Sequence, residues 1–337
     1  AGWIEGDSEE WAYLLGVRTS RILSGCSQRR LAGLLEDKIR LTSRALMSAS
    51  VRVDSWWNSN ASTRTLPINP TISPTEVGYV DRSEAFASPR LAFDYSVTDR
   101  LTLKGSISRA FRSPTLNELY RSFRVGNVLT LSNAALTSEK QTGVEAGASY
   151  ALSNSQTLTA TYFWSHIDDP VSNRTLTITP SLITRQRQNL GSLRSTGVEA
   201  AWESRWNGTI STSIAYQYAN AVVSDFPADT SLIGLWIPQV ARNNATAQLR
   251  FERPGNYTLV IGGRYQGLQF DDDRNLFRLD GYFVGEVYGS KSVGRNLQVF
   301  LGVENLLNRR YEVAQTPVTM IGPPILARAG VRFTLGR

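Results

Sequence analysis

The chain has few of the residues that build most catalytic and metal sites. Its 337 residues include one cysteine, Cys26, and one histidine, His166. A single cysteine cannot form a disulfide within the chain, and a single histidine cannot form a histidine-rich metal site. The sequence also has no run of about 18 apolar residues, which excludes a membrane-spanning helix. A transmembrane β-barrel is not excluded, because each of its strands needs only about 10 alternating residues.

The charge and the aromatic content give further information on the class of protein. The net charge is +7, but no basic helix or RNA-binding signature occurs, so nucleic-acid binding is not expected. Aromatic residues make up 10% of the chain, with 8 Trp and 13 Tyr. This content suits the aromatic girdles of a membrane barrel, although a soluble β-protein could show the same.

Alternation of apolar and polar residues predicts β-strands along most of the chain. Between residues 101 and 150, two alternating runs flank a long polar segment, which begins at Ser113-Pro114 and contains one predicted helical turn at 115–121. The same period of two recurs in residues 158–164, 198–206, 210–218 and 297–303. The polar faces carry carboxylates, so they must meet water, either outside a soluble sheet or inside a wet lumen.

The connections alternate between tight and long from about residue 84 onward. Tight turns are predicted at 98–100, 152–155, 207–208, 253–256 and 292–295. Long polar connections are predicted at 113–136, 169–181, 223–240 and 306–324, with a shorter one at 270–275. An up-and-down barrel with short turns at one end and long loops at the other produces this alternation, whereas a Greek-key sandwich does not. The predicted fold class is therefore all-β, a transmembrane antiparallel up-and-down β-barrel of about 14 strands.

The secondary structure of the first 45 residues is the hardest to predict from the sequence. Residues 29–47 have leucines at helical spacing, so a helix competes there with two strands joined at 36–38. The next strand is predicted to end at Trp56-Trp57 and to lead into a polar connection over 58–82. Because the N-terminus lacks a signal peptide, the sequence is expected to be a fragment or a processed product.

Several ordered motifs carry a family resemblance. They are Ala110-Phe111-Arg112-Ser113-Pro114-Thr115-Leu116 with Glu118-Leu119-Tyr120, Asn133 to Glu139, Gly143-Val144-Glu145, Gln188 to Gly191 with Gly197-Val198-Glu199, Val303 to Asn305 with Asn308 and Tyr311, and a final alternating strand that includes Phe333. In this order they resemble the C-terminal barrel of TonB-dependent outer-membrane receptors. The sequence departs from the family where Ala134 and Ser138 replace the usual prolines, and where residues 334–337 follow Phe333.

The resemblance implies a fold, a function and partners. Residues 1–337 would form part of a barrel of about 22 strands, with residues 46–337 covered most clearly and the plug absent. The receptor would lie in the bacterial outer membrane, bind an iron–siderophore or cobalamin cargo, and import it with TonB energy transmitted through the plug. Lipid and lipopolysaccharide would be further partners, and neither enzymatic activity nor a cofactor is implied. The isolated 337 residues are expected to transport nothing selectively.

Three sets of side chains are candidates for chemistry. Ser165 and His166 are adjacent on a strand and point to opposite faces, so they cannot form a catalytic pair. Asp271-Asp272-Asp273 is a weak calcium candidate, because it lacks the glycine and terminal glutamate of an EF-hand loop, and a solvated loop with no metal is the favoured interpretation. The candidate ligand-binding residues, chosen as arginines that favour an anionic chelate and aromatics that stack, are Arg112, Tyr120, Arg121, Phe123, Arg124 and Trp236.

Two other functions remain open from the sequence. One is a passive channel made by a complete mid-sized barrel without a plug. The other is a soluble secreted β-sheet protein that binds a small ligand. Conductance without TonB would support the first, and recovery without detergent would support the second.

Overall fold

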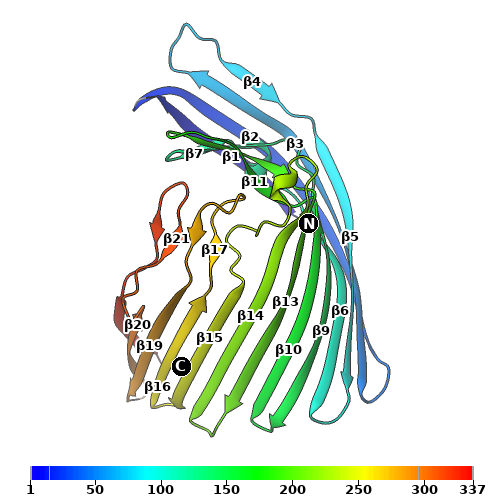
Figure 1. Ribbon diagram of the computed structural model, residues 1–337, viewed down its shortest axis with the longest axis vertical. Helices are drawn as coiled ribbons and strands as arrows, with labels where there is room; N and C mark the ends of the chain where they lie inside the picture. The colour runs from blue at the N-terminus through cyan, green and yellow to red at the C-terminus, as the bar shows by residue number, and fades with distance from the viewer. Residues whose placement is uncertain (1, 15, 295, 336–337) are drawn as a thin grey trace.

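The computed structural model describes residues 2–14, 16–294 and 296–335, and one large antiparallel sheet dominates it (Figure 1). The sheet has 15 strands, and all but β4 follow one another as a meander. The meander consists of β1 (Gly2–Leu14), β2 (Val17–Arg40), β3 (Ala45–Pro67), β5 (Arg82–Ser96), β6 (Leu101–Arg112), β9 (Glu139–Ser153), β10 (Gln156–Asp168), β13 (Ser192–Arg205), β14 (Ile210–Asp225), β15 (Asn243–Arg253), β16 (Tyr257–Gln266), β19 (Tyr282–Val293), β20 (Leu297–Glu304) and β23 (Leu326–Phe333). The predicted all-β, up-and-down sheet of about 14 strands is confirmed.

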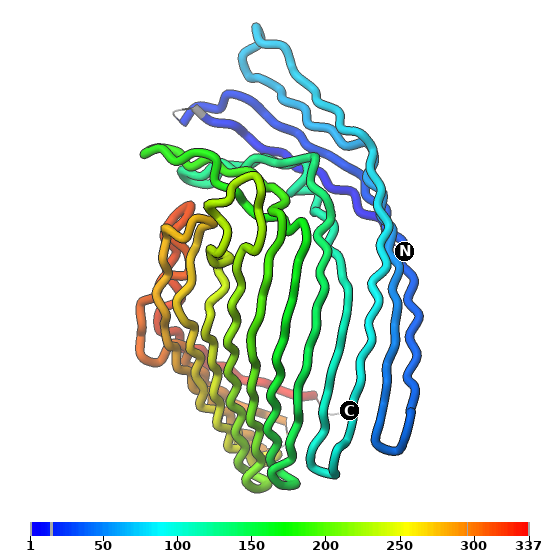
Figure 2. The backbone as a smooth tube through the Cα atoms, turned by 45° about the vertical axis from the view of Figure 1, so that its right-hand side comes forward, coloured from blue at the N-terminus to red at the C-terminus, as the bar shows by residue number. Residues whose placement is uncertain are grey.

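The sheet curves like part of a barrel wall, and its two ends differ (Figure 2). Short turns join β2 to β3, β5 to β6, β9 to β10, β13 to β14, β15 to β16 and β19 to β20 at one end. All but one of the connections at the other end are long, and β1, β2 and β3 rise beyond the other strands there. Within the described residues, no pairing joins β1 to β23. The predicted alternation of tight and long connections therefore corresponds to the two rims of the sheet.

The sheet is a single layer, and its apolar rows do not form a dry interior. The outer row of β5 and β6 includes Leu91, Phe93, Leu103 and Ile107, each at least 42% exposed. Register aligns these rows from strand to strand, since Leu91 pairs with Ile107 and Ile107 with Val144. The opposite face of the same strands carries Lys104, Ser106 and Glu145. One apolar and one polar face in a single layer suits lipid on one side and water on the other.

No helix in the part of the chain that the structure describes is long and apolar enough to cross a membrane.

The N-terminal region differs from the sequence-based prediction. Residues 29–47 form no helix, and β2 runs through the predicted turn at 36–38, because residues 31–40 pair without a break with residues 46–55 of β3. The turn lies at 41–44, where the Leu41 amide donates to Ala45 O at 3.0 Å. β3 also continues past Trp56-Trp57 to Pro67, so the polar connection begins only at residue 68. Residues 58–67 stay in the sheet because β2 pairs with most of them, with a bulge at Asn60, and the short β4 (Thr75–Gly78) pairs with residues 62–65 on the other side.

The long connections contain ordered structure. The first includes α1 (Leu116–Tyr120), which confirms the predicted helical turn, followed by β7 (Phe123–Val125) and β8 (Val128–Leu131). The second forms a hairpin of β11 (Val171–Ile178) and β12 (Ile183–Asn189), so it extends well beyond the predicted 169–181. β8 and β12 pair in parallel, which joins both connections into one four-stranded sheet at the loop end (Figure 1). The later connections carry η1 (Thr230–Leu232), β17 (Gln269–Phe270), β18 (Arg278–Leu279), β21 (Glu312–Ala314) and β22 (Met320–Ile321).

Candidate functional site

The segment that follows β6 is folded by its own sequence. Thr115 is the N-cap of α1, and its hydroxyl accepts the Glu118 amide at 3.2 Å. The Glu118 carboxylate accepts the Thr115 amide in return at 2.7 Å, which completes a capping box. Pro114 and Leu119 are fully buried beside it. This local folding fixes the start of the loop against the end of the sheet.

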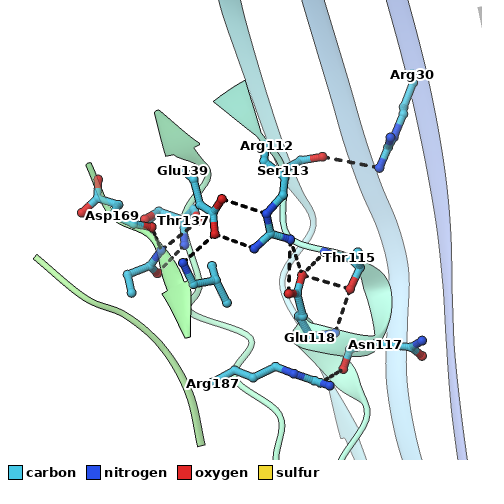
Figure 3. A network of polar contacts seen from close by, with 12 residues as sticks. Arg30, Arg112, Ser113, Thr115, Asn117, Glu118, Thr137, Glu139, Asp169 and Arg187 are labelled. Carbon is cyan, nitrogen blue, oxygen red and sulfur yellow. Dashed lines mark hydrogen bonds and ion pairs between the residues drawn. The ribbon is translucent and has the colours of Figure 1, made fainter. Parts of the chain in front are cut away.

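An ionic network ties this loop to its neighbours (Figure 3). Arg112 donates two hydrogen bonds to Glu139, at 2.8 and 2.6 Å, and two to Glu118, at 3.2 and 3.0 Å. Glu139 also accepts the Val171 amide at 2.6 Å. One guanidinium therefore joins β6, α1, β9 and β11, and in this structure its donors are used by two carboxylates.

The pKa of Glu118 reflects this setting. Burial acts to raise the pKa of its carboxyl, but the hydrogen bonds from Thr115 and Arg112 outweigh burial and lower it. Glu118 is thus held as a carboxylate on the loop side of the sheet.

The predicted ligand-binding residues do not share one surface. Tyr120 is 3% exposed and packs in a cluster with Cys26, Leu119 and Leu136, its ring centroid 4.9 Å from that of Tyr79. Trp236 packs within the loops instead: the Arg242 guanidinium of the same connection lies 3.5 Å from the centre of its ring, and the Phe270 ring of the next connection lies 5.4 Å from it. Their assignment as ligand residues stays a prediction.

Phe123, in contrast, lies among arginines. The guanidinium of Arg121 is 5.7 Å from the centre of its ring and that of Arg187 is 5.3 Å from it. Arg121 pairs with Glu10, Arg187 donates to the carbonyl of Asn117 at 2.6 Å, and the exposed Arg124 donates to that of Gly126 at 3.0 Å. The structure therefore brings Arg121 and Phe123 together with Arg187, whereas Arg124 follows Phe123 on β7 and points to the opposite face of that strand.

Two arginines of this region escaped the sequence analysis. Arg185 and Arg187 alternate on β12, and Arg185 donates through Nε to Thr130 at 2.9 Å. Burial lowers the pKa of both guanidinium groups, because it disfavours the charged form. The alternating Thr-Arg-Gln-Arg-Gln run was the available signal, but it lay beyond the predicted loop at 169–181.

The acidic turn at Asp271-Asp272-Asp273 ties loops together. Asp271 accepts the amides of Gln315 and Thr316, at 2.8 and 2.7 Å. Asp273 accepts the amide and hydroxyl of Thr175, at 3.0 and 2.7 Å, while Asp272 accepts amides of its own turn. Across the ranges described, no three His, Cys, Asp or Glu side chains form a group suited to a metal ion. Calcium binding here stays a prediction that nothing in the structure supports.

Ser165 and His166 remain apart as predicted from strand geometry. The hydroxyl of Ser165 accepts Gln141 Nε2 at 2.9 Å, whereas His166 Nε2 lies 3.2 Å from the carboxylate of Asp168. The His166 ring stacks on Trp164 with 6.0 Å between centroids.

The remaining motif residues serve local geometry. Asn305 and Asn308 have positive φ, and Asn305 accepts the amide of Arg309 and donates to two carbonyls. Tyr311 stacks on Tyr282 at 4.0 Å. The others make the following contacts: Phe111 stacks on Phe86, Asn133 donates to the Arg187 carbonyl, Glu145 accepts Ser106, Glu199 accepts Gln217, Gly197 lies against Phe163 and Tyr218, and the exposed Phe333 pairs with Leu297.

Comparison with known proteins gives one family and a consistent fold. A family model described as TonB dependent receptor-like, beta-barrel matches residues 15–306. The ferric yersiniabactin uptake receptor FyuA from Yersinia pestis aligns with a TM-score of 0.73 and 17% identity, covering 98% of this chain and 49% of that one. The copper transporter OprC gives 0.68 and 17%, covering 94% and 48%, and the ferric citrate transporter FecA gives 0.65 and 17%, covering 98% and 50%. The chain spans about half the length of these structures.

Proposed function

The chain belongs to the TonB-dependent receptor family, as the match of residues 15–306 to its β-barrel shows, and from this premise we propose that it forms part of an outer-membrane receptor for a scarce nutrient. The receptor binds its cargo on the loop side and imports it with energy from TonB, which acts through a plug enclosed by the barrel. The proposal for residues 1–337 is a partial barrel domain within such a receptor. Iron–siderophore complexes are the proposed cargo class, and cobalamin is the alternative.

One observation carries the choice of an anionic metal chelate. The guanidinium groups of Arg121 and Arg187 lie 5.7 and 5.3 Å from the centre of the Phe123 ring, and Arg124 follows Phe123 in the chain. Burial disfavours the charge of Arg187, so an anion beside it would regain the stabilisation that water no longer supplies. A flat aromatic ring among cations suits a chelate that presents both carboxylate or catecholate oxygens and a planar face.

The names of the similar structures support the same class. FyuA is described as a ferric yersiniabactin uptake receptor and FecA as a ferric citrate transporter, while OprC is described as a copper transporter. At 17% identity these likenesses establish the fold alone, so the cargo is proposed from the arginines.

The test is a titration of the detergent-solubilised chain with an anionic ferric chelate, a neutral ferric chelate and cyanocobalamin, followed by tryptophan fluorescence. We expect the anionic chelate to bind most tightly, and Arg187→Gln and Arg124→Gln each to weaken it about tenfold or more, because one lost charge-assisted hydrogen bond is worth about 1.5–3 kcal/mol. Arg253→Gln, an exposed arginine at the short-turn end, is the matched control and should have no effect.

Two results would contradict the proposal. Equal binding of all three compounds would contradict the proposal that the cargo is an anionic metal chelate. Solute uptake in cells that persists unchanged without TonB, together with steady conductance in planar bilayers, would instead identify a passive channel.

A further inference from the structure

A line of basic side chains crosses four neighbouring strands on the apolar face of the sheet. Arg109 of β6 pairs with Thr142 of β9, Thr142 with His166 of β10, and His166 with Arg194 of β13. Direct cross-strand partners point to the same face, so these side chains form one row. We call Arg109, His166 and Arg194 the basic row.

The row lies on the face that the sheet presents to lipid. The next row toward the short turns consists of Ile107, Val144, Trp164 and Thr196, in the same register. Below that, Tyr162 pairs with Val198, which are 48% and 45% exposed. Acidic and amide side chains such as Glu145 and Gln217 belong to the opposite face. The basic row therefore forms the border of the apolar band on the side of the long loops.

The height of the row matches the edge of a membrane. His166 lies ten residues beyond Gln156, the first residue of β10. At about 3.3 Å per residue and a tilt of about 40–45°, this corresponds to about 25 Å along the barrel axis. The apolar band of outer-membrane barrels is also about 25 Å tall. Since the long loops of such barrels are extracellular, the row lies at the head groups of the outer leaflet.

The arginines of the row have free donors. Both are exposed, and within the described ranges neither guanidinium makes a hydrogen bond or an ion pair with the protein. Asp168 and Asp225 flank Ser192 one row closer to the loops, and the Asp168 carboxylate lies 3.2 Å from His166 Nε2, so in the described part of the chain the row's histidine has an acidic partner and its two arginines do not. Trp164 stacks on His166 at the boundary, where tryptophan is favoured between lipid tails and water. Long arginine stems allow the charge to reach the head groups while the methylenes stay against the tails.

We propose that the basic row is a binding site for the phosphate groups of an anionic outer-leaflet lipid, lipopolysaccharide. The inference rests on the proposed outer-membrane placement but not on the cargo. Arg109 and Arg194 bind the phosphates through charge-assisted hydrogen bonds, and the acyl chains lie along the Ile107 and Val144 row. The bound lipid holds the sheet at a fixed height in the outer leaflet, at the level where the long loops begin.

The test measures retention of lipid A on the detergent-solubilised chain by native mass spectrometry. The double variant Arg109→Gln/Arg194→Gln should bind lipid A about 25-fold more weakly, since one basic residue near an anionic surface contributes about fivefold. The charge-preserving Arg109→Lys/Arg194→Lys should keep most of the affinity, and a common far-UV spectrum checks that all variants fold. Arg90→Gln/Lys104→Gln, two exposed cations of the opposite face, should match the parent.

The outcomes separate this inference from its premise. Equal affinity of the parent and the Arg109/Arg194 double variant, or equal affinity for dephosphorylated lipid A, overturns the basic row as a phosphate site. Full competition by inorganic phosphate shows a site for the free anion and also overturns the lipid assignment. Absence of lipid A binding by every protein, the parent included, contradicts the membrane placement itself.

Discussion

The sheet and the loop end of this molecule are stabilised in different ways. The sheet is one layer whose apolar residues stay exposed, so its order comes from the backbone ladder and from the medium on each face. The loop end has buried clusters, including Leu119 with Leu136 and Leu190 with Phe226, together with the Arg112 network. The sheet therefore depends on strand pairing and on the media proposed for its two faces, whereas the loops are stabilised by buried side chains, as in a small soluble protein.

The most disruptive change to the sheet should be Gly197→Ala. Gly197 on β13 lies under the ring of Phe163, and an added Cβ would collide with the carbonyl oxygen of Tyr218 on β14. Relieving the collision breaks the ladder between β13 and β14, so we expect a loss of about 4 kcal/mol or more and little folded protein. Far-UV circular dichroism and heat-modifiable gel mobility measure this.

Gly289→Ala is the matched control, because a Cβ at this strand position of β19 meets open space. If both variants assemble equally well, close backbone packing does not limit the sheet.

The loop end should respond most to Leu119→Ala. Leu119 is 0% exposed in the cluster with Tyr120 and Leu136, so truncation leaves a cavity and costs about 2–5 kcal/mol of the free energy of unfolding of the loop. Hydrogen exchange at residues 116–136 should rise while exchange in β13 and β14 stays unchanged. Leu34→Ala, at a sheet leucine that is 64% exposed, should change neither. Faster exchange throughout the sheet in Leu119→Ala would show that the two regions are not independent.

This contrast also explains how much the sequence could predict. Alternation identifies strands such as β6 and β9 because one face of the sheet is apolar and the other is polar, a condition that repeats every two residues. The helical turn at 115–121 is predicted from Ser113-Pro114; the structure has Pro114 just before the N-cap Thr115, and the capping box that fixes the turn also lies within four residues of sequence. The parallel pairing of β8 with β12 was not, since it joins segments more than 50 residues apart in the chain.

The candidate site was harder to predict than the fold. Arg121, Phe123 and Arg124 were singled out as cations and an aromatic ring near the motif at 110–120, but Arg187 reaches Phe123 from another connection. Tyr120 has the same residue chemistry as a ligand-stacking aromatic, and only the tertiary packing shows that it is buried. The role of a loop side chain depends on its contacts with distant segments, and the local pattern of apolar and polar residues does not indicate these contacts.

Glu139→Gln should uncouple two loops with a moderate effect. Glu139 accepts Arg112 twice and the Val171 amide once, and glutamine keeps one neutral acceptor in place of the carboxylate. We expect local opening at Val171 to become easier by about 1–2 kcal/mol, from hydrogen exchange, with the sheet unaffected. Glu145→Gln on the same strand is the control, because among the described residues the Glu145 carboxylate accepts a hydrogen bond from Ser106 alone. Unchanged protection at Val171 would show that the amide does not depend on this charge.

Acidification should produce the smallest effect, confined to α1. The folded-state pKa of Glu118 is lowered because the hydrogen bonds from Thr115 and Arg112 outweigh burial, so the unfolded segment binds its proton at a higher pH than the folded one. The stabilisation is therefore complete above the ordinary glutamate pKa of about 4.3 and is lost as the pH falls through the lower folded value. Protection of the Leu119 and Arg121 amides, corrected for intrinsic exchange, should decrease over that range by about tenfold or less, because the Arg112 partner is partly exposed. In Glu118→Gln the protection should be lower at neutral pH and should lack this acid transition; if the same transition persists, another carboxylate controls the helix and the capping box is only incidental to it.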